Sequence, residues 1–237
     1  MKKIAVLGRG KSLESLSSLP EVDAYVITNN WGLELNQQFI MDRFSDNKPI
    51  IHVLSLSIFN APGMSFDELL KHYKKFNIQK IILPYVRECV PGGEQSYFEI
   101  EGKTNVIKAE PLPDEVKPFM WQSGKGNCPK NYTGKKYDLP TTGMAGVLYA
   151  TAVMNPTEVY ICGMDFYEKT YAFQTKREEE RNKIDSNGIM GVSEFEKIPM
   201  KIFLTENIIG KFPDKKFLIN TYGDYKPNKD NVEVNTL

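Results

Sequence analysis

Small polar residues and tyrosines lie in the second half of the chain at a spacing suited to a phosphorylated ligand. Thr141, Thr142 and Gly143 precede an apolar run with helical spacing, and the unpaired N–H groups at the start of a helix attract phosphate. Tyr167 and Tyr171 follow a strand-like apolar run, and phenol hydroxyls can stabilise a phosphate that gains charge as it leaves. We therefore predict that these residues form half of a nucleotide-sugar site.

A glycine-rich turn follows the first apolar run, with the sequence Gly8-Arg9-Gly10-Lys11-Ser12. Such a turn lets a ligand approach the backbone closely. Counted from Ala5, the spacing also fits the loose phosphate-loop pattern, which would indicate an NTPase or kinase with magnesium-dependent ATP binding, in which backbone amides and Lys11 hold the phosphates. We favour the tight turn, because Val6 and Leu7 continue the strand and leave too short a loop to wrap a triphosphate.

Other candidate ligand contacts come directly after predicted strands. Asn29 and Asn30 follow the second strand and Ser55 the third, and amide side chains can bind a base or a ribose. Asparagine is also a common turn former, which leaves a purely structural interpretation open. The loop after residue 162 adds Gly163, Met164 and Asp165. Parallel sheets bind ligands at the carboxyl ends of their strands, so we expect these residues to lie near one another.

The order of the predicted elements indicates an α/β fold. Hydrophobic periodicity predicts strands at residues 3–7, 24–28, 50–54, 81–83, 158–162 and 216–220, and helices at 13–19, 34–44, 65–76, 142–154 and 200–211. This alternation predicts a mainly parallel, Rossmann-like sheet with helices on both faces. Glycine and proline in residues 85–138 predict an irregular insertion, and the charged residues 168–198 a lid-like segment. We expect one domain over residues 1–237.

Composition argues against several classes of function. The formal net charge is zero, which gives nucleic-acid binding little electrostatic support. No apolar run approaches a membrane span and no secretory segment is evident, so we expect a cytoplasmic protein. The three cysteines share no metal-type spacing. His52 and His72 lie away from the motifs and are expected to be structural, and neither a metal site nor a cofactor is expected.

Two blocks of sequence resemble the bacterial sialyltransferases of glycosyltransferase family 42, which use CMP-sialic acid without a metal. The first is the Gly-x-Gly-x-Ser-Leu turn with Asn29, and the second holds Thr-Thr-Gly, Gly-x-Asp-Phe-Tyr and Tyr-Ala-Phe-x-Thr-Lys between residues 141 and 176. The resemblance implies a single-domain GT-A-like variant in which Tyr167 and Tyr171 bind the phosphate. It also implies donor contacts at Gly8, Gly10, Ser12, Asn29, Thr141, Thr142 and Gly163. Their neighbours Arg9, Asn30, Ser55, Gly143, Met164 and Asp165 are further candidates from the sequence, although Arg9 replaces an asparagine of the family's first turn.

The chain departs from the family pattern in the general base. The resemblance places a catalytic histidine after Lys176, but residues 187–193 contain none. Asp185 and Glu194 lie in the same segment and are the candidates for this role. The prediction is a metal-independent inverting glycosyltransferase that moves sialic acid or a related acidic sugar from a CMP donor to a glycan acceptor, and family analogy suggests an oligomer. The alternative is a CMP-binding homologue without catalytic activity.

Overall fold

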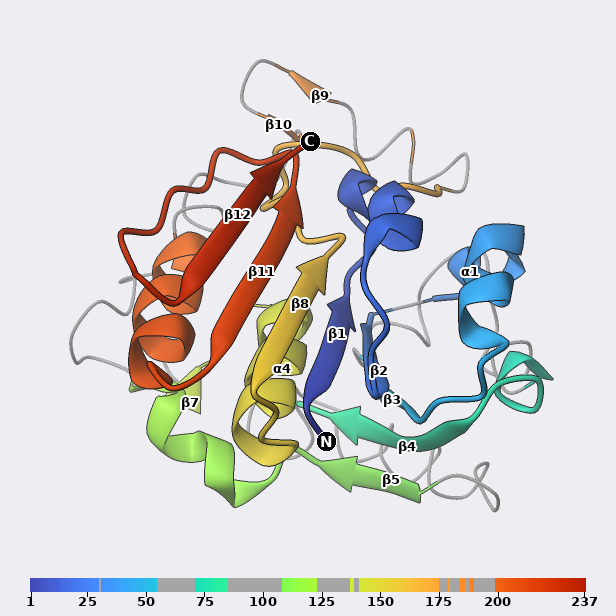
Figure 1. Ribbon diagram of the computed structural model, residues 1–237, viewed down its shortest axis with the longest axis horizontal. Helices are drawn as coiled ribbons and strands as arrows, with labels where there is room; N and C mark the ends of the chain where they lie inside the picture. The colour runs from blue at the N-terminus through green and yellow to red at the C-terminus, as the bar shows by residue number, and fades with distance from the viewer. Residues whose placement is uncertain are drawn as a thin grey trace.

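Eight parallel strands form one sheet in the order β12-β11-β8-β1-β2-β3-β4-β5 (Figure 1). The structure is a computed structural model that describes residues 1–29, 31–54, 71–84, 108–122, 137–138, 141–174, 179, 184–185, 188–189 and 199–237. The strands of the sheet are β1 (Lys3–Leu7), β2 (Ala24–Thr28), β3 (Ile50–Val53), β4 (Ile78–Leu83), β5 (Lys108–Pro111), β8 (Glu158–Cys162), β11 (Lys216–Thr221) and β12 (Val232–Thr236). The predicted α/β, Rossmann-like sheet is confirmed.

Helices cover both faces of this sheet because side chains along each strand alternate between the two faces. In β1, Ile4 and Val6 join one hydrophobic cluster, while Ala5 and Leu7 join another. The first cluster is covered by α4 (Thr142–Leu148), η5 (Tyr149–Val153) and η6 (Phe203–Ile208), and the second by η1 (Lys11–Ser18), η2 (Glu34–Asn36) and α1 (Gln38–Phe44). Shorter elements are η4 (Asp114–Phe119), β6 (Trp121–Gln122), β7 (Tyr137–Asp138), β9 (Ile184–Asp185), β10 (Gly188–Ile189) and η7 (Ile209–Lys211).

Several elements differ from the sequence-based prediction. The helix expected at 13–19 is the 3₁₀-helix η1, the one expected at 34–44 divides into η2 and α1, and part of the one expected at 200–211 is the π-helix η6. The sequence analysis expected neither β5, which lies within the proposed insertion at 85–138, nor β12. The helix expected at 65–76 lies mostly outside the described residues. Among the residues that are described, no helix is both long and apolar enough to cross a membrane.

The chain changes direction across the sheet between β1 and β8. From β1 the strands proceed through β2, β3 and β4 to β5 on one side, and the chain then returns through α4 to place β8, β11 and β12 on the other side. The carboxyl ends of β1, β8, β11 and β12 point toward the edge of the molecule where the C-terminus lies (Figure 1). Loops at such a reversal diverge and leave a crevice, the usual ligand site of open parallel sheets.

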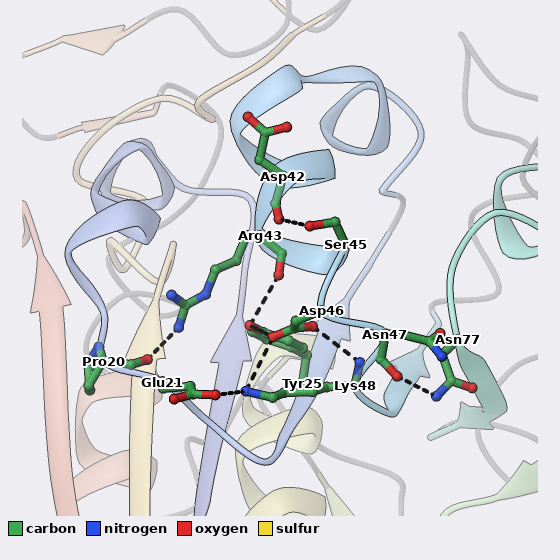
Figure 2. Close-up of polar contacts among 10 residues, drawn as sticks. All are labelled: Pro20, Glu21, Tyr25, Asp42, Arg43, Ser45, Asp46, Asn47, Lys48 and Asn77. Carbon is green, nitrogen blue, oxygen red and sulfur yellow. Dashed lines mark hydrogen bonds and ion pairs between the residues drawn. The ribbon is translucent and has the colours of Figure 1, made fainter.

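A polar cluster fixes the opposite, amino-terminal end of β2. Figure 2 shows Lys48 bridging Glu21 at 2.8 Å and Asp46 at 3.4 Å, so that the loop before β2 is tied to the loop before β3. The Tyr25 hydroxyl donates to Asp46 at 3.3 Å, and the Arg43 guanidinium donates to the Pro20 carbonyl. These contacts anchor the start of the strand whose other end leads to Asn29.

Candidate active site

A pocket opens at the reversal point, above the ends of β1, β2 and β8. It holds about 520 Å³ of empty space, which includes solvent at its open mouth. Five segments far apart in the sequence form its walls: the turn after β1, the end of β2, the start of α4, the loop after β8 and the helical residue Met200. Its lining residues are Gly8, Arg9, Gly10, Thr28, Asn29, Thr141, Gly143, Met144, Gly163, Met164, Asp165, Phe166, Tyr167, Lys169, Tyr171 and Met200.

Two glycines allow the turns after β1 and β8 to pass each other in direct backbone contact. A Cβ atom on Gly8 would lie 2.2 Å from the Gly163 carbonyl oxygen, and one on Gly163 would lie 2.4 Å from the Gly8 carbonyl oxygen. Gly163 also has a φ of +75°, a conformation that glycine adopts far more readily than other residues. The Gly10 N–H donates to the Gly163 carbonyl at 2.7 Å. This backbone hydrogen bond joins the turn after β1 to the turn after β8, and both turns line the pocket.

Hydrogen bonds to the Asp165 carboxylate stabilise the crossing of these two turns. Its Oδ2 accepts from the Ser12 N–H at 2.8 Å, and its Oδ1 accepts from the Tyr222 N–H at 2.9 Å and the Thr221 hydroxyl at 3.1 Å. The Ser12 hydroxyl is fully buried and accepts from the Gly163 N–H at 2.9 Å. These groups join three loops, and their polar atoms are engaged within the protein.

A buried ion pair holds one of the two predicted phosphate-binding tyrosines. Arg9 Nε lies 2.6 Å from Glu34 Oε1, with side chains that are 8% and 0% exposed. The guanidinium carbon lies 4.8 Å from the centre of the Tyr171 ring, a favourable distance for a cation over an aromatic face. Gly10 and Tyr171 also form an antiparallel bridge, and the Ala172 N–H donates to the Arg9 carbonyl at 2.8 Å. The segment carrying Tyr171 is thus fixed to the glycine-rich turn.

His52 contacts the backbone of Asn29, a residue that lines the pocket. Its Nε2 lies 2.5 Å from the Asn29 carbonyl oxygen, which can only accept a hydrogen bond, so Nε2 carries the proton. Nδ1 then accepts from the Tyr73 hydroxyl. Burial lowers the pKa of His52 to about 4, so the ring is neutral at pH 7. Asn29 itself has a φ of 68°. The structural role expected of His52 agrees with this geometry, but its expected remoteness from the motifs is wrong, because it contacts Asn29.

The start of α4 forms another wall of the pocket. Thr141 is the N-cap, and its hydroxyl accepts from the Met144 N–H at 3.2 Å. The Met164 sulfur lies 3.3 Å from where a Gly143 Cβ would be, so this thioether packs on the first turn of the helix. Tyr167 and Tyr171 line the same pocket as Thr141 and Gly143. The phenol-bearing residues and the start of this helix therefore border one space.

The first phenol is carried by an unusual stretch of backbone. Phe166 and Tyr167 have φ values of 51° and 61°, and two successive left-handed residues other than glycine are uncommon. Phe166 is 2% exposed and its ring centre lies 4.9 Å from that of Tyr225. The Glu168 N–H donates to the Asp165 carbonyl at 2.9 Å and closes the turn. Core packing and this turn hold the left-handed pair in place.

Solved structures share this arrangement of elements. The sialyltransferase CstII from Campylobacter jejuni, solved with the substrate analogue CMP-3FNeuAc, aligns with a TM-score of 0.53 and 18% identity over 99% of this chain and 86% of the other. A second CST-II structure, with a trisaccharide acceptor and CMP, aligns with a TM-score of 0.53 and 17% identity over 92% and 80% of the two chains. The chain has a sialyltransferase-like fold. No model of a known protein family matches the sequence, and no curated protein sequence matches it.

Within this sialyltransferase-like fold, the pocket brings together most of the residues singled out from the sequence. The predicted residues that line it are Gly8, Arg9, Gly10, Asn29, Thr141, Gly143, Gly163, Met164, Asp165, Tyr167 and Tyr171. Ser12 and Thr142 are buried and do not line it. Asn30, Ser55 and Glu194 lie outside the described residues, and Asp185 is described only as part of the backbone of β9.

The sequence analysis missed several contributors, among them Thr28 and Phe166, which also line the pocket. Lys169 lines the pocket between the two tyrosines, and the even spacing of Tyr167, Lys169 and Tyr171 was a signal that could have identified it. Met144 and Met200 line it from helical segments whose apolar pattern indicated only a core position. Glu34 is a buried carboxylate that pairs with Arg9, and no local pattern predicts such a contact.

Lys11 lies outside this pocket. Its ammonium nitrogen is 2.6 Å from Glu14 Oε1 at the surface, and its side chain is 43% exposed. The Ser12 hydroxyl, which would bind magnesium in a phosphate loop, is buried against Gly163. This geometry disfavours a phosphate-loop NTPase. Across the described segments, no group of three or more histidine, cysteine, aspartate or glutamate side chains lies close enough together to hold a metal ion.

Proposed function

We propose that this protein is a metal-independent inverting glycosyltransferase of the family 42 type. It would transfer sialic acid or a related acidic sugar from a CMP-activated donor to a glycan acceptor. The observation that carries the proposal is the single pocket where the glycine-rich turn, Asn29, the start of α4 and the residues Tyr167 and Tyr171 meet. The shared fold with the CstII sialyltransferases supports the same assignment.

Each wall of the pocket suits one part of a CMP-sugar. The turn at Gly8 and Gly10 lets the nucleoside approach the backbone closely, and the Asn29 side chain can pair with the base or ribose. The phosphate would lie between the start of α4 and the two phenols. The sugar would then extend toward the pocket mouth, where the acceptor enters.

The proposed reaction breaks the bond between the anomeric carbon and the phosphate oxygen. The phosphate leaves with the electron pair, and Tyr167 and Tyr171 would donate hydrogen bonds to its growing negative charge. The acceptor hydroxyl oxygen bonds to the anomeric carbon from the opposite side and gives its proton to a general base. Asp185 and Glu194 remain the proposed bases.

The test is substitution of both phenols. Tyr167→Phe with Tyr171→Phe should reduce kcat by about 10²–10³-fold, the usual effect of removing a donor to transition-state charge, while CMP affinity changes far less. Tyr160→Phe is the matched control, because the Tyr160 hydroxyl bonds Glu158 at 2.5 Å and the residue does not line the pocket. Turnover of the double variant equal to that of the control would refute the phenols' role. A chelator should leave the wild-type rate unchanged.

One observation favours a second function, a CMP-binding protein without transferase activity. The chain has two histidines, and neither His52 nor His72 lines the pocket. A neutral, buried His52 cannot accept a proton from an acceptor hydroxyl there. CMP binding without donor hydrolysis or transfer, in the wild-type protein and with a range of acceptors, would support this alternative. Transfer that is abolished by Asp185→Asn or Glu194→Gln would instead assign the base.

A further inference from the structure

The pocket contains two charged side chains that the protein itself has already paired. Among the described lining residues, the ionic side chains are Arg9, Asp165 and Lys169. Arg9 forms its buried ion pair with Glu34 at 2.6 Å. The Asp165 carboxylate accepts two backbone N–H groups and the Thr221 hydroxyl. These two charges stabilise the walls of the pocket.

Lys169 differs because its charge is uncompensated. Its side chain is exposed, and within the portion of the chain that the structure describes its ammonium group forms no hydrogen bond or ion pair. The adjacent acid, Glu168, instead pairs with Lys201 and accepts from the Asp224 N–H at 2.5 Å. An ammonium on a pocket wall that has no partner of its own can donate directly to a negatively charged group of a ligand.

The backbone on both sides of Lys169 is anchored. On one side, the Glu168 N–H donates to the Asp165 carbonyl at 2.9 Å. On the other, the Thr170 carbonyl accepts from the Lys11 N–H at 3.0 Å. The lysine side chain is a flexible stem with a compact charge. Its attachment point is therefore fixed beside the two phenols, while its ammonium is free to follow an anionic group of a ligand.

We propose that Lys169 is the anion-binding residue of this pocket and holds a negatively charged oxygen of the donor, either on the phosphate or on the sugar carboxylate. This inference rests on the proposed function and adds the residue that selects a charged donor. A lysine contact to an anion is mainly electrostatic, so its contribution decreases as ionic strength rises.

The experiment compares Lys169→Met and Lys169→Arg with Lys11→Met, which removes the same charge from a neighbouring lysine outside the pocket. Calorimetric titrations use cytidine, CMP and a 3-fluoro CMP-sialic acid analogue at low and high salt. Lys169→Met should weaken binding of an anionic ligand about tenfold, equivalent to about 1.4 kcal/mol. Cytidine binding should not change, Lys169→Arg should retain most of the affinity, and Lys11→Met should bind like the wild type. Thermal unfolding of all three variants should match the wild type.

The pattern across ligands identifies the anion. A loss for CMP assigns the contact to the phosphate, and a loss for the analogue alone assigns it to the carboxylate. The inference is overturned if all ligands bind Lys169→Met and wild type equally, or if cytidine weakens as much as CMP. In that case strong CMP binding by the wild type would leave the proposed function standing. A wild-type protein that binds neither CMP nor the analogue would overturn both.

Discussion

Stability should decrease on mild acidification because of His52. The ring is buried, its Nε2 proton bonds the Asn29 carbonyl, and its Nδ1 accepts from the Tyr73 hydroxyl. Burial lowers the pKa of His52 to about 4 in the folded protein, whereas an unfolded chain titrates histidine near 6.5. Between these values the unfolded state binds a proton that the folded state does not. The free energy of unfolding must therefore fall as the pH drops below about 6.5.

The magnitude follows from the two pKa values of His52. Their difference is about 2.5, and at about 1.36 kcal/mol for each unit the full loss is about 3 kcal/mol by pH 4. At pH 5.0 the same linkage relation gives about 2 kcal/mol, and at pH 7.5 almost none. A domain is typically stabilised by about 5–15 kcal/mol, so urea unfolding can resolve this change.

The assay compares urea unfolding of the wild type and His52→Gln at pH 7.5 and 5.0. Glutamine can still donate to the Asn29 carbonyl but does not titrate. Other groups titrate in both proteins and cancel in the comparison, so the wild type should lose about 2 kcal/mol more than the variant over this interval. Equal losses in the two proteins would refute the assignment of a neutral, desolvated His52.

Three further substitutions test the walls of the pocket. Gly163→Ala should lower the melting temperature and abolish CMP binding, because a left-handed alanine costs about 1–2 kcal/mol and its Cβ would meet the Gly8 carbonyl 2.4 Å away; unchanged binding would contradict the close crossing. Glu34→Gln should reduce stability in urea by about 3–5 kcal/mol, since it removes the carboxylate charge that lies 2.6 Å from the buried Arg9 guanidinium, and adding Arg9→Met should restore part of that loss. Asp165→Asn should destabilise by about 1–3 kcal/mol through a lost acceptor, visible as a lower urea midpoint with an unchanged slope.

The central strands could be predicted from sequence because they are buried on both faces. Strands β1, β2 and β8 have the predicted bounds, and their residues form nearly continuous apolar runs. The outermost strands β5 and β12 have no such signal. The β12 residues alternate between intermediate and exposed positions, and β5 lies in a stretch rich in proline and glycine. These two segments are strands because each pairs with a neighbouring strand. A local sequence pattern holds no information about such pairing.

Helix type was less predictable than helix position. Apolar spacing identifies which residues face the sheet, and Leu13 and Leu16 of η1 are indeed fully buried. It does not determine whether the backbone bonds are three, four or five residues apart. The Ser12 N–H belongs to the first turn of η1, where N–H groups have no partner within a helix, and it bonds Asp165 instead.

Some residues of the candidate site could likewise be identified from local sequence patterns, whereas the roles of others depend on contacts between distant parts of the chain. The glycine-rich turn, the strand-end Asn29 and the paired tyrosines are local signals at the carboxyl edge of a sheet, and Gly8, Gly10, Asn29, Tyr167 and Tyr171 line one pocket. The role of Asp165 depended on contacts with Ser12 and Tyr222, which are 153 and 57 residues away. A sequence pattern of Gly-x-Asp is compatible with either ligand binding or loop anchoring, and the hydrogen bonds favour anchoring.

The sequence pattern and the backbone conformation both single out Tyr167. Tyr167 was singled out as a phosphate ligand from its place after a buried strand, and its φ of 61° marks it independently as a strained position. A left-handed residue of this size costs about 1–3 kcal/mol and persists only where its surroundings enforce it. Here the buried Phe166 and the Glu168 turn enforce it. Because relaxation to an ordinary conformation would redirect the phenol, this backbone conformation determines how Tyr167 lines the pocket.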